Sequence, residues 1–339
     1  MRRLLNTLFV TSEDIYLSLD GENVVASREK EAVARYPLHT LTAILTFAYP
    51  GASPALMGAC AQRGISLSFC TPGGKFLARV TGEANGNVLL RRTQYRMADD
   101  PVQSCGIARA MVFGKVHNAR WSIERTRRDH GLRVDDQRLG EVSSQLKTML
   151  SRLLQETDLD SLRGVEGASA TAYFGVFDQM ILGDRSVFHF ETRSRRPPLD
   201  PVNALLSFAY SLLSHDCAGA LESVGLDSYV GFLHRDRPGR SSLALDLMEE
   251  FRPCMADRFV LTCINNRIFQ KTDFVYRENG GVLLSESGRR TFLQRWQERK
   301  KDSLTHPFLG EKVPWGLVPY LQALLLARFL RGDLEAYPP

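Results

Sequence analysis

Near Gly82 the hydrophobic pattern of this 339-residue chain changes its period. Before that point the chain has short runs rich in β-branched and aromatic residues, such as LLNTLFV, IYLSL and NVVAS, which are typical of strands. After it, apolar residues recur at helical spacing over residues 89–97, 107–129 and 139–154. The sequence therefore predicts an α+β protein. It has a small amino-terminal β-rich domain over residues 1–80, a hinge over residues 81–87, and a larger all-α catalytic domain over residues 88–339.

The amino-terminal domain is expected to contain two hairpins and one helix. Asp20, Gly21 and Glu22 separate IYLSL from NVVAS as a hairpin turn would, and residues 71–74 separate SLSFC from KFLARV in the same way. Between the two hairpins, the chain predicts a short helix that ends at Gly64. The result is a β-rich domain with a single helix.

The composition fits a folded cytoplasmic protein. A hydrophobic fraction of 44% is enough for a substantial core, and a formal charge of +5 permits nucleic acid as a partner without requiring it. The six cysteines include no CxxC pair, as expected of reduced thiols. Residues 36–62 carry no formal charge, but three prolines and a glycine interrupt them, so no membrane span is expected.

A histidine and three acidic residues come close together in the segment GFLHRDRPGRSSLALDLMEEFRP, residues 231–253. His234 precedes an arginine-rich turn, and Asp246, Glu249 and Glu250 follow at spacings that place them on one side of a helix. Like charges this close repel each other unless a cation or a basic partner lies among them. The segment therefore indicates a metal site, although an acidic patch on a helix is more commonly a solvated face.

A further candidate ligand, Glu166, lies upstream in the segment RGVEGASATAYFGVFDQMI. The small and apolar residues around it let a neighbouring helix approach closely. A carboxylate in such surroundings is costly to desolvate unless it is paired, hydrogen-bonded or bound to a metal. Glu166 is therefore either a third metal ligand or the partner of one of the many arginines.

Four segments in this order resemble the CRISPR-associated Cas1 family of spacer-acquisition integrases. They are the glycine-flanked Glu166, the run PPLDPVNALLSFAYSLL, GFLH with His234, and LALDLMEEFRP with Glu249. Two further segments, YPLHTLTAIL and GISLSFCTPGGKFLARV, resemble the small β-domain of the same family. The resemblance thus covers most of the chain.

The resemblance implies that Glu166, His234 and Glu249 are catalytic and bind one metal ion. Two carboxylates and an imidazole suit Mg²⁺ or Mn²⁺, and the nitrogen ligand favours Mn²⁺. Asp246 lies three residues before Glu249 and is expected to complete or orient the site. Glu250 is the alternative ligand if the helix is rotated.

The run DPVNALLSFAYSLL predicts a helix with Asp200 as its cap and a proline at its first position. Asn203, Ser207 and Tyr210 recur at spacings of four and three and so lie on one face of this helix. Their spacing alone favours a buried hydrogen-bond network between helices. The resemblance implies instead that they support the metal ligands from behind.

Arginines gather in the same part of the chain, before the DPVN helix and in the loop after His234. Guanidinium groups match phosphate oxygens and hold a DNA backbone without reading its bases. We therefore expect Arg235, Arg237 and Arg240 to contact DNA, although an arginine cluster is more commonly a solvated loop.

For the whole protein, the resemblance implies a CRISPR adaptation integrase and DNA endonuclease. Metal-dependent transesterification would insert the 3′-hydroxyl ends of double-stranded protospacer DNA at the CRISPR repeat. The implied assembly is a homodimer that joins the Cas2 protein in a heterohexamer-type complex. Two alternatives stay open: a metal-dependent DNA nuclease without integration, and a non-catalytic DNA-binding scaffold.

Towards its carboxyl end the sequence predicts a hairpin around Asn279 and Gly280, a charged helix over residues 289–301 and an apolar helix over residues 319–330. The last two prolines, Pro338 and Pro339, are expected to form a loose tail.

Overall fold

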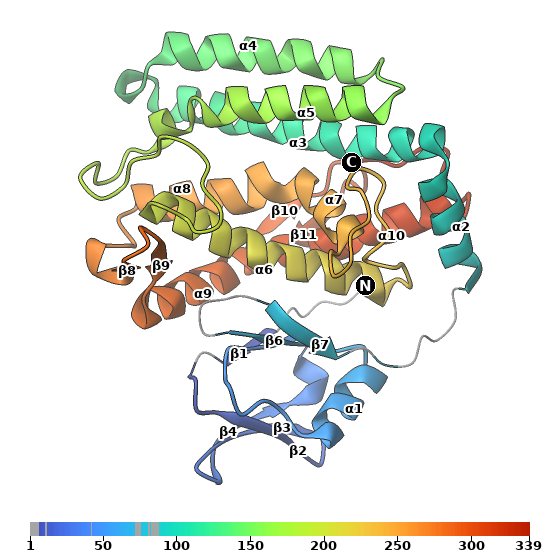
Figure 1. Ribbon diagram of the computed structural model, residues 1–339, viewed down its shortest axis with the longest axis vertical. Coiled ribbons are helices and arrows are strands. Elements are labelled where there is room, and N and C mark those ends of the chain that lie inside the picture. Colours follow the sequence, from blue (N-terminus) through green and yellow to red (C-terminus); the bar gives the residue numbers. More distant parts are fainter. Residues whose placement is uncertain (1–6, 11, 42, 72–75, 81, 83–87) are drawn as a thin grey trace. The chain divides into compact units, whose positions relative to one another are not determined.

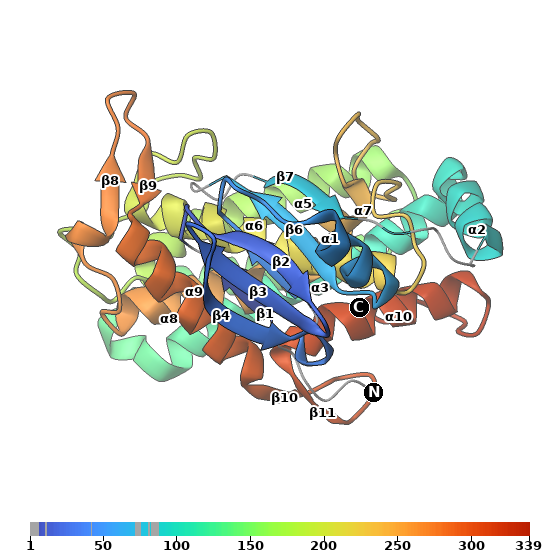
Figure 2. The same cartoon turned by 90° about the horizontal axis from the view of Figure 1, so that it is seen from below.

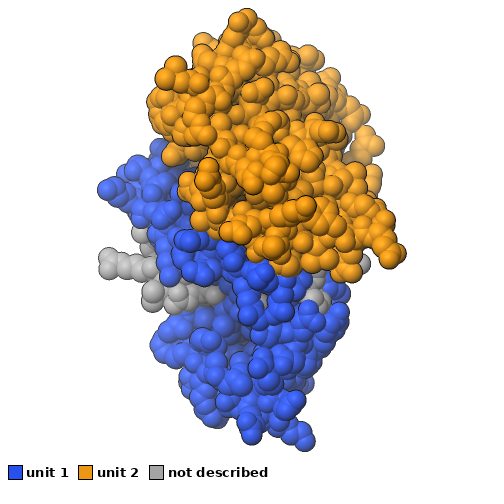
Figure 3. All heavy atoms as spheres, turned by 90° about the vertical axis from the view of Figure 1, so that its left-hand side faces the viewer, with its two compact units in different colours: residues 1–85, 286–317 blue, residues 86–285, 318–339 orange. Residues whose placement is uncertain are grey.

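The computed structural model describes residues 7–10, 12–41, 43–71, 76–80, 82 and 88–339. The chain divides into two compact units, residues 1–85 with 286–317, and residues 86–285 with 318–339 (Figure 3). The chain is β-rich in its amino-terminal region and mostly helical after it, so the predicted α+β class is confirmed. Residues 286–317, which we predicted to lie in the helical domain, belong to the first unit. Of the predicted hinge, only Gly82 lies within the described residues.

The first unit contains two larger sheets. One has four strands in the order β1 (Thr7–Val10), β5 (Ala43–Thr46), β6 (Ser66–Cys70) and β7 (Phe76–Val80), the first three parallel and the last antiparallel. The other is the antiparallel meander β2 (Tyr16–Asp20), β3 (Asn23–Arg28) and β4 (Glu31–Pro37), seen from below in Figure 2. Both predicted hairpins are confirmed, since β2 pairs with β3 and β6 pairs with β7. Residues 72–74 of the second predicted turn lie outside the described residues.

One helix covers these strands, as predicted. α1 (Pro54–Gln62) begins at Ser53, whose hydroxyl accepts a hydrogen bond from the amide of Leu56, and Gly64 takes a left-handed conformation just after its end. The unit also contains α9 (Glu286–Lys301) and the hairpin of β10 (Ser303–Thr305) and β11 (Lys312–Pro314). Its apolar core includes the fully buried side chains Leu17, Val24, Leu38, Ile44, Leu56 and Leu67.

The second unit is built from helices (Figure 1). Its longer elements are α2 (Val88–Asp99), α3 (Pro101–His130), α4 (Asp136–Leu153), α5 (Leu159–Phe174), α6 (Pro201–Ser223), α7 (Ser242–Phe251), α8 (Arg258–Asn265) and α10 (Val318–Leu330). A short hairpin of β8 (Phe274–Tyr276) and β9 (Val282–Leu284) confirms the turn predicted around Asn279. α3 packs against α4, α5 and α7, and α6 packs against α7 and α10. α7 thus lies between the two longest helices.

The two long helices start with the same local signal. At α6, the carboxylate of Asp200 accepts a hydrogen bond from the amide of Asn203 (2.7 Å) and Pro201 follows it, as predicted. At α3, Asp100 accepts from the amides of Val102 (2.9 Å) and Gln103 (3.2 Å), again before a proline. Apolar spacing alone predicted the start of this helix at residue 107, six residues late, because the Asp-Pro pair that caps it carries no apolar signal.

The carboxyl-terminal tail is packed against the helices, so the prediction of a loose tail is wrong. Tyr337 is 5% exposed, and its hydroxyl donates to Oε1 of Glu250 (2.6 Å). The side chain of Gln322 donates to the carbonyl of Pro338 (2.5 Å). The tail therefore gives a buried glutamate of α7 a polar partner that local sequence does not provide. No described helix has the combination of length and apolarity that crossing a membrane requires.

The packed tail yields a stability prediction. Tyr337→Ala removes a buried aromatic ring and should lower the free energy of unfolding by about 3 to 5 kcal/mol. Tyr337→Phe keeps the ring but loses the hydrogen bond to Glu250, and should cost about 1 to 3 kcal/mol. Urea denaturation measures both. Tyr229→Ala, at a 44% exposed position of the same unit, is the matched control and should change little. A tail that contributes nothing would leave all three variants alike.

Candidate active site

The loop that carries His234 is held by one buried carboxylate of α7. Asp246 is fully buried, and its Oδ2 accepts hydrogen bonds from the amides of Phe232 (2.6 Å) and Leu233 (2.9 Å). Its Oδ1 accepts from the amide of His234 (3.0 Å) and faces Nδ1 of the same residue (2.5 Å). Both oxygens of Asp246 are therefore engaged, and its role in this structure is to fix the loop and the imidazole.

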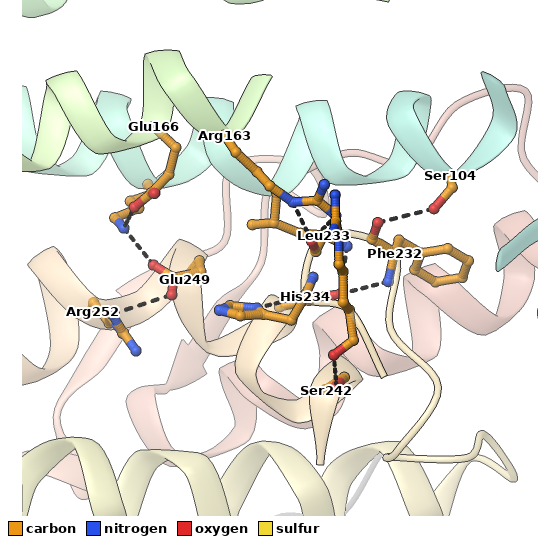
Figure 4. A network of polar contacts seen from close by, with 12 residues as sticks. Ser104, Arg163, Glu166, Phe232, Leu233, His234, Ser242, Glu249 and Arg252 are labelled. Atoms are coloured by element: carbon orange, nitrogen blue, oxygen red, sulfur yellow. Dashed lines mark hydrogen bonds and ion pairs between the residues drawn. The ribbon is translucent and has the colours of Figure 1, made fainter. Parts of the chain in front are cut away.

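The carbonyl groups of this loop are held as well (Figure 4). Ser104 of α3 donates to the carbonyl of Phe232 (2.9 Å), and Arg163 of α5 donates through Nε (3.0 Å) and Nη2 (2.7 Å) to that of Leu233. Gly231 is required just before, because a Cβ there would lie 2.7 Å from Oδ2 of Asp246. Three helices thus determine where His234 stands.

The contact with Asp246 also selects the tautomer of His234. A carboxylate can only accept, so Nδ1 carries the proton and donates it to Oδ1 of Asp246. Nε2 then presents a lone pair, which can bind a metal ion or take a proton. In Figure 4 the ring points from its loop towards the side of α7 that carries Glu249.

Glu166 and Glu249 are brought together by Lys115 of α3. The ammonium group forms ion pairs with Oε1 of Glu166, on α5, and with Oε2 of Glu249, on α7 (2.6 Å). Glu249 makes a second ion pair with Arg252 (3.2 Å). Burial alone would raise the pKa of Glu249, but the charges of Arg252 and Lys115 outweigh burial and lower this pKa to about 2. Glu166 is therefore salt-bridged in this structure, though to a lysine rather than to an arginine.

The residues predicted to share a polar face of α6 contact two arginines, one of which is the Arg252 that pairs with Glu249. Nη1 of Arg193 donates to the Oδ1 of Asn203 (2.6 Å), and Nη2 donates to the hydroxyl of Ser207 (3.0 Å). The guanidinium groups of Arg193 and Arg252 both lie over the ring of Tyr210, at 5.2 and 4.8 Å from its centroid. Two of the three residues thus hold Arg193, and the third supports the arginine that pairs with Glu249.

Tyr210 also connects the site to a buried acid. Its hydroxyl donates to Oδ1 of Asp257 (2.5 Å), in the π-helical turn Arg252–Asp257 that follows α7. Burial raises the pKa of Asp257 to about 6, against the opposing effects of the Tyr210 hydrogen bond and of the nearby arginines. Asp257 is thus linked to the site through the hydroxyl of Tyr210.

Glu250 faces away from the other acidic residues. It is buried, bonds to Tyr337 of the tail, and has its pKa raised to about 8, chiefly by burial. We predicted that Asp246, Glu249 and Glu250 lie on one side of the helix. In the structure Asp246 holds the histidine loop and Glu249 meets Lys115, while Glu250 meets the tail. Adjacent helical positions differ by about 100° in direction, which separates Glu250 from Glu249.

The three arginines predicted to contact DNA lie in the loop between His234 and α7. Arg235 and Arg237 are exposed and Arg240 is partly exposed. Arg235 donates to Asp160 of α5 (3.1 Å). These residues form a solvated loop that follows His234.

Lys115 was missed by the sequence analysis. The signal was present, because Lys115 is the single charged residue in the run AMVFGKVHNA of a helix whose inner face is apolar. A lone lysine on a buried face needs an acidic partner. What the sequence alone could not give is which acids, since both partners come from other helices.

The donor set suits a divalent cation in two respects. Glu166 and Glu249 already accommodate a positive charge between them, and the buried Oε2 of Glu249 has this cation, the ammonium group of Lys115, as its partner. Within the described part of the chain, however, no three His, Cys, Asp or Glu side chains are gathered closely enough to hold a metal as they stand. A metal ion would therefore require these side chains to move.

Comparisons with known proteins point in one direction. Residues 8–298 match the family model described as CRISPR associated protein Cas1. The chain is 51% identical over its full length to "CRISPR-associated endonuclease Cas1 2" of Rhodospirillum rubrum and 48% identical to "CRISPR-associated endonuclease Cas1 1" of Chlorobaculum tepidum, covering 99% of each. Among solved structures, a casposase bound to integration product has a TM-score of 0.82 at 23% identity, over 99% of this chain and 93% of that one. A CAS1 protein from Thermotoga maritima has a TM-score of 0.82 at 20% identity, over 98% and 99%.

The raised pKa of Glu250 predicts how stability depends on pH. Between its ordinary value of 4.5 and about 8, the folded protein keeps a proton on Glu250 that the unfolded chain has lost, so stability falls as pH rises. From pH 7 to 8, above the pKa of about 6 that burial gives Asp257, this loss should amount to about 1 kcal/mol in the wild type and be absent in Glu250→Gln. Urea denaturation across this range tests it, and equal slopes for both proteins would refute it.

The fourfold hydrogen bonding of Asp246 predicts that even an isosteric change is costly. In Asp246→Asn an amide group replaces one acceptor oxygen and turns its own hydrogens towards buried N–H donors. The free energy of unfolding should fall by at least about 2 kcal/mol. Asp135→Asn, at the exposed cap of α4 where either residue can accept from the Arg138 amide, should be nearly neutral by the same urea assay. A neutral Asp246→Asn would mean that the loop does not depend on this carboxylate.

Proposed function

The chain belongs to the Cas1 family of CRISPR-associated proteins, and from this premise we propose that it is a metal-dependent DNA endonuclease and integrase of CRISPR adaptation. It joins the 3′-hydroxyl end of a protospacer to the CRISPR repeat by transesterification. The reaction needs no energy source, because one phosphodiester bond replaces another. The endonuclease names of its relatives and its fold likeness to a casposase bound to integration product support this proposal.

The observation that carries the proposal is the convergence of three side chains. Lys115 joins Glu166 on α5 to Glu249 on α7, and the ring of His234 points from its loop towards the side of α7 that carries Glu249 (Figure 4). His234 has Nε2 free because Nδ1 is committed to Asp246. The buried carboxylate of Asp246 and the two hydrogen-bonded carbonyls of Phe232 and Leu233 thus fix the position of the imidazole.

We propose that Glu166, His234 and Glu249 hold a single Mg²⁺ or Mn²⁺ ion. When bound, such an ion polarises a phosphoryl oxygen and stabilises the charge that develops in an in-line displacement. Asp246 accepts from Nδ1 of His234 and so fixes the direction in which Nε2 points. Arg252 keeps Glu249 ionised, since its charge lowers the pKa of that carboxyl.

DNA would be held by its backbone beside this group. Arg235, Arg237 and Arg240 leave the histidine loop on the solvent side, where guanidinium groups can meet phosphates. The proposed partners are protospacer and repeat DNA, a second copy of this chain, and the Cas2 protein. A chain of similar fold occurs in a solved Cas6-RT-Cas1–Cas2 complex, with a TM-score of 0.79 at 23% identity, over 98% of this chain and 36% of that one.

The proposal is tested with purified protein, a short duplex with free 3′ ends and a supercoiled plasmid carrying CRISPR repeats, in Mn²⁺ and in Mg²⁺, with and without Cas2. The wild type should join the duplex covalently to the plasmid. His234→Ala should lower the rate of joining by at least about a hundredfold, as loss of an essential imidazole does. His130→Ala, an exposed histidine at the end of α3, is the control and should join normally.

Each other outcome selects an alternative. Metal-dependent nicking without joining, even with Cas2 present, would identify a nuclease without integration. DNA binding with no metal-dependent reaction, and no difference between His234→Ala and wild type, would leave only a non-catalytic scaffold.

A further inference from the structure

Lys115 stands where two metal-binding carboxylates would have to meet. It lies on the inner face of α3 with a side chain 11% exposed, and it joins α3 to both α5 and α7 through Glu166 and Glu249. Arg252 pairs with Glu249 alone, and Arg163 is occupied with the Leu233 carbonyl and Asp160. Lys115 is therefore the cation that contacts both carboxylates.

An ammonium group in this position solves an electrostatic problem of the metal-free protein. The side chains of Glu166 and Glu249 are 26% and 4% exposed, so water screens their mutual repulsion poorly. They also come from different helices, so repulsion would push α5 and α7 apart. The charge of Lys115 removes this repulsion and holds the two carboxylates at a common point.

The same position excludes a divalent ion. Mg²⁺ and Mn²⁺ bind carboxylate oxygens at about 2.0 to 2.2 Å, closer than an ammonium group does. Oε1 of Glu166 and Oε2 of Glu249 are the oxygens that Lys115 occupies. An ammonium and a divalent cation cannot share them, because like charges in a poorly solvated pocket repel strongly.

We propose that Lys115 is an exchangeable internal counter-ion of the metal site, a positioning residue that assembles Glu166 and Glu249 without metal and leaves when the metal ion binds. Metal loading is then an exchange of one cation for another. The side chain of lysine suits this role, since four flexible methylene groups let the ammonium swing away while the helix stays in place. The inference rests on the proposed function, because it takes Glu166 and Glu249 as ligands.

The test measures metal binding without DNA and without turnover. Mn²⁺ is titrated into metal-free wild type and Lys115→Met by isothermal calorimetry, and the melting temperature of each is recorded with and without Mn²⁺. Removing the competing charge should tighten Mn²⁺ binding roughly tenfold or more. The metal-free variant should melt at a lower temperature than wild type, and Mn²⁺ should raise its melting temperature by more.

Two further variants complete the design. Lys147→Met removes an exposed lysine of α4 and should bind Mn²⁺ as the wild type does, which separates a local effect from a change in net charge. Lys115→Arg keeps the charge and adds a bidentate fork that grips carboxylates more firmly. It should therefore bind Mn²⁺ more weakly than wild type, and it gives an independent reading if Lys115→Met fails to fold.

The outcomes separate this inference from the proposed function. If wild type binds Mn²⁺ and Lys115→Met binds it equally or more weakly, Lys115 is no competitor and the inference is overturned while the metal site stands. If Lys115→Met alone binds Mn²⁺, exchange is supported in its strongest form. If none of the folded proteins binds Mn²⁺, both the metal site and the inference fail.

Discussion

Four hydrogen-bond donors converge on the buried carboxylate of Asp246, and the geometry of the whole site depends on this convergence. A buried carboxylate is costly unless its oxygens are satisfied, and here three backbone amides and an imidazole satisfy them. The arrangement turns an otherwise irregular loop into a fixed support for His234. α3 and α5 reinforce it from the carbonyl side through Ser104 and Arg163. The histidine therefore stands on a loop whose backbone amides and carbonyls are hydrogen-bonded to three helices.

The rest of the site is organised by charge compensation. Glu249 would be costly to bury by itself, and Lys115 and Arg252 make its ionised form favourable. Arg252 in turn packs on the ring of Tyr210, which also contacts Arg193. Each charged group is therefore held by a neighbour from another segment. Removing any one of these charged or aromatic side chains would leave its partner without compensation. The positions of the two carboxylates therefore depend on how α3, α5, α6 and α7 pack.

Local signals predicted the fold well, and distant partners explain what was missed. The hairpin at Gly21, the helix after Asp200 and the change to helical period follow from turn chemistry, capping and apolar spacing, all of which act over a few residues. Four segments with the right order led to Glu166, His234 and Glu249. The roles of Lys115 and Tyr337 could not be read in the same way. Lys115 pairs with Glu166, 51 positions away along the chain, and Tyr337 donates to Glu250, 87 positions away.

The docked tail has a practical consequence for handling the protein. A Cβ added at Gly114 would lie 3.2 Å from Pro339 and 3.4 Å from Glu250, so Pro339 lies close to both α3 and α7. Gly114 is the neighbour of Lys115 in α3, and Glu250 is the neighbour of Glu249 in α7. A label attached at Pro339 would therefore start beside the helices that carry Lys115 and Glu249, and an exposed internal loop is the safer place for it.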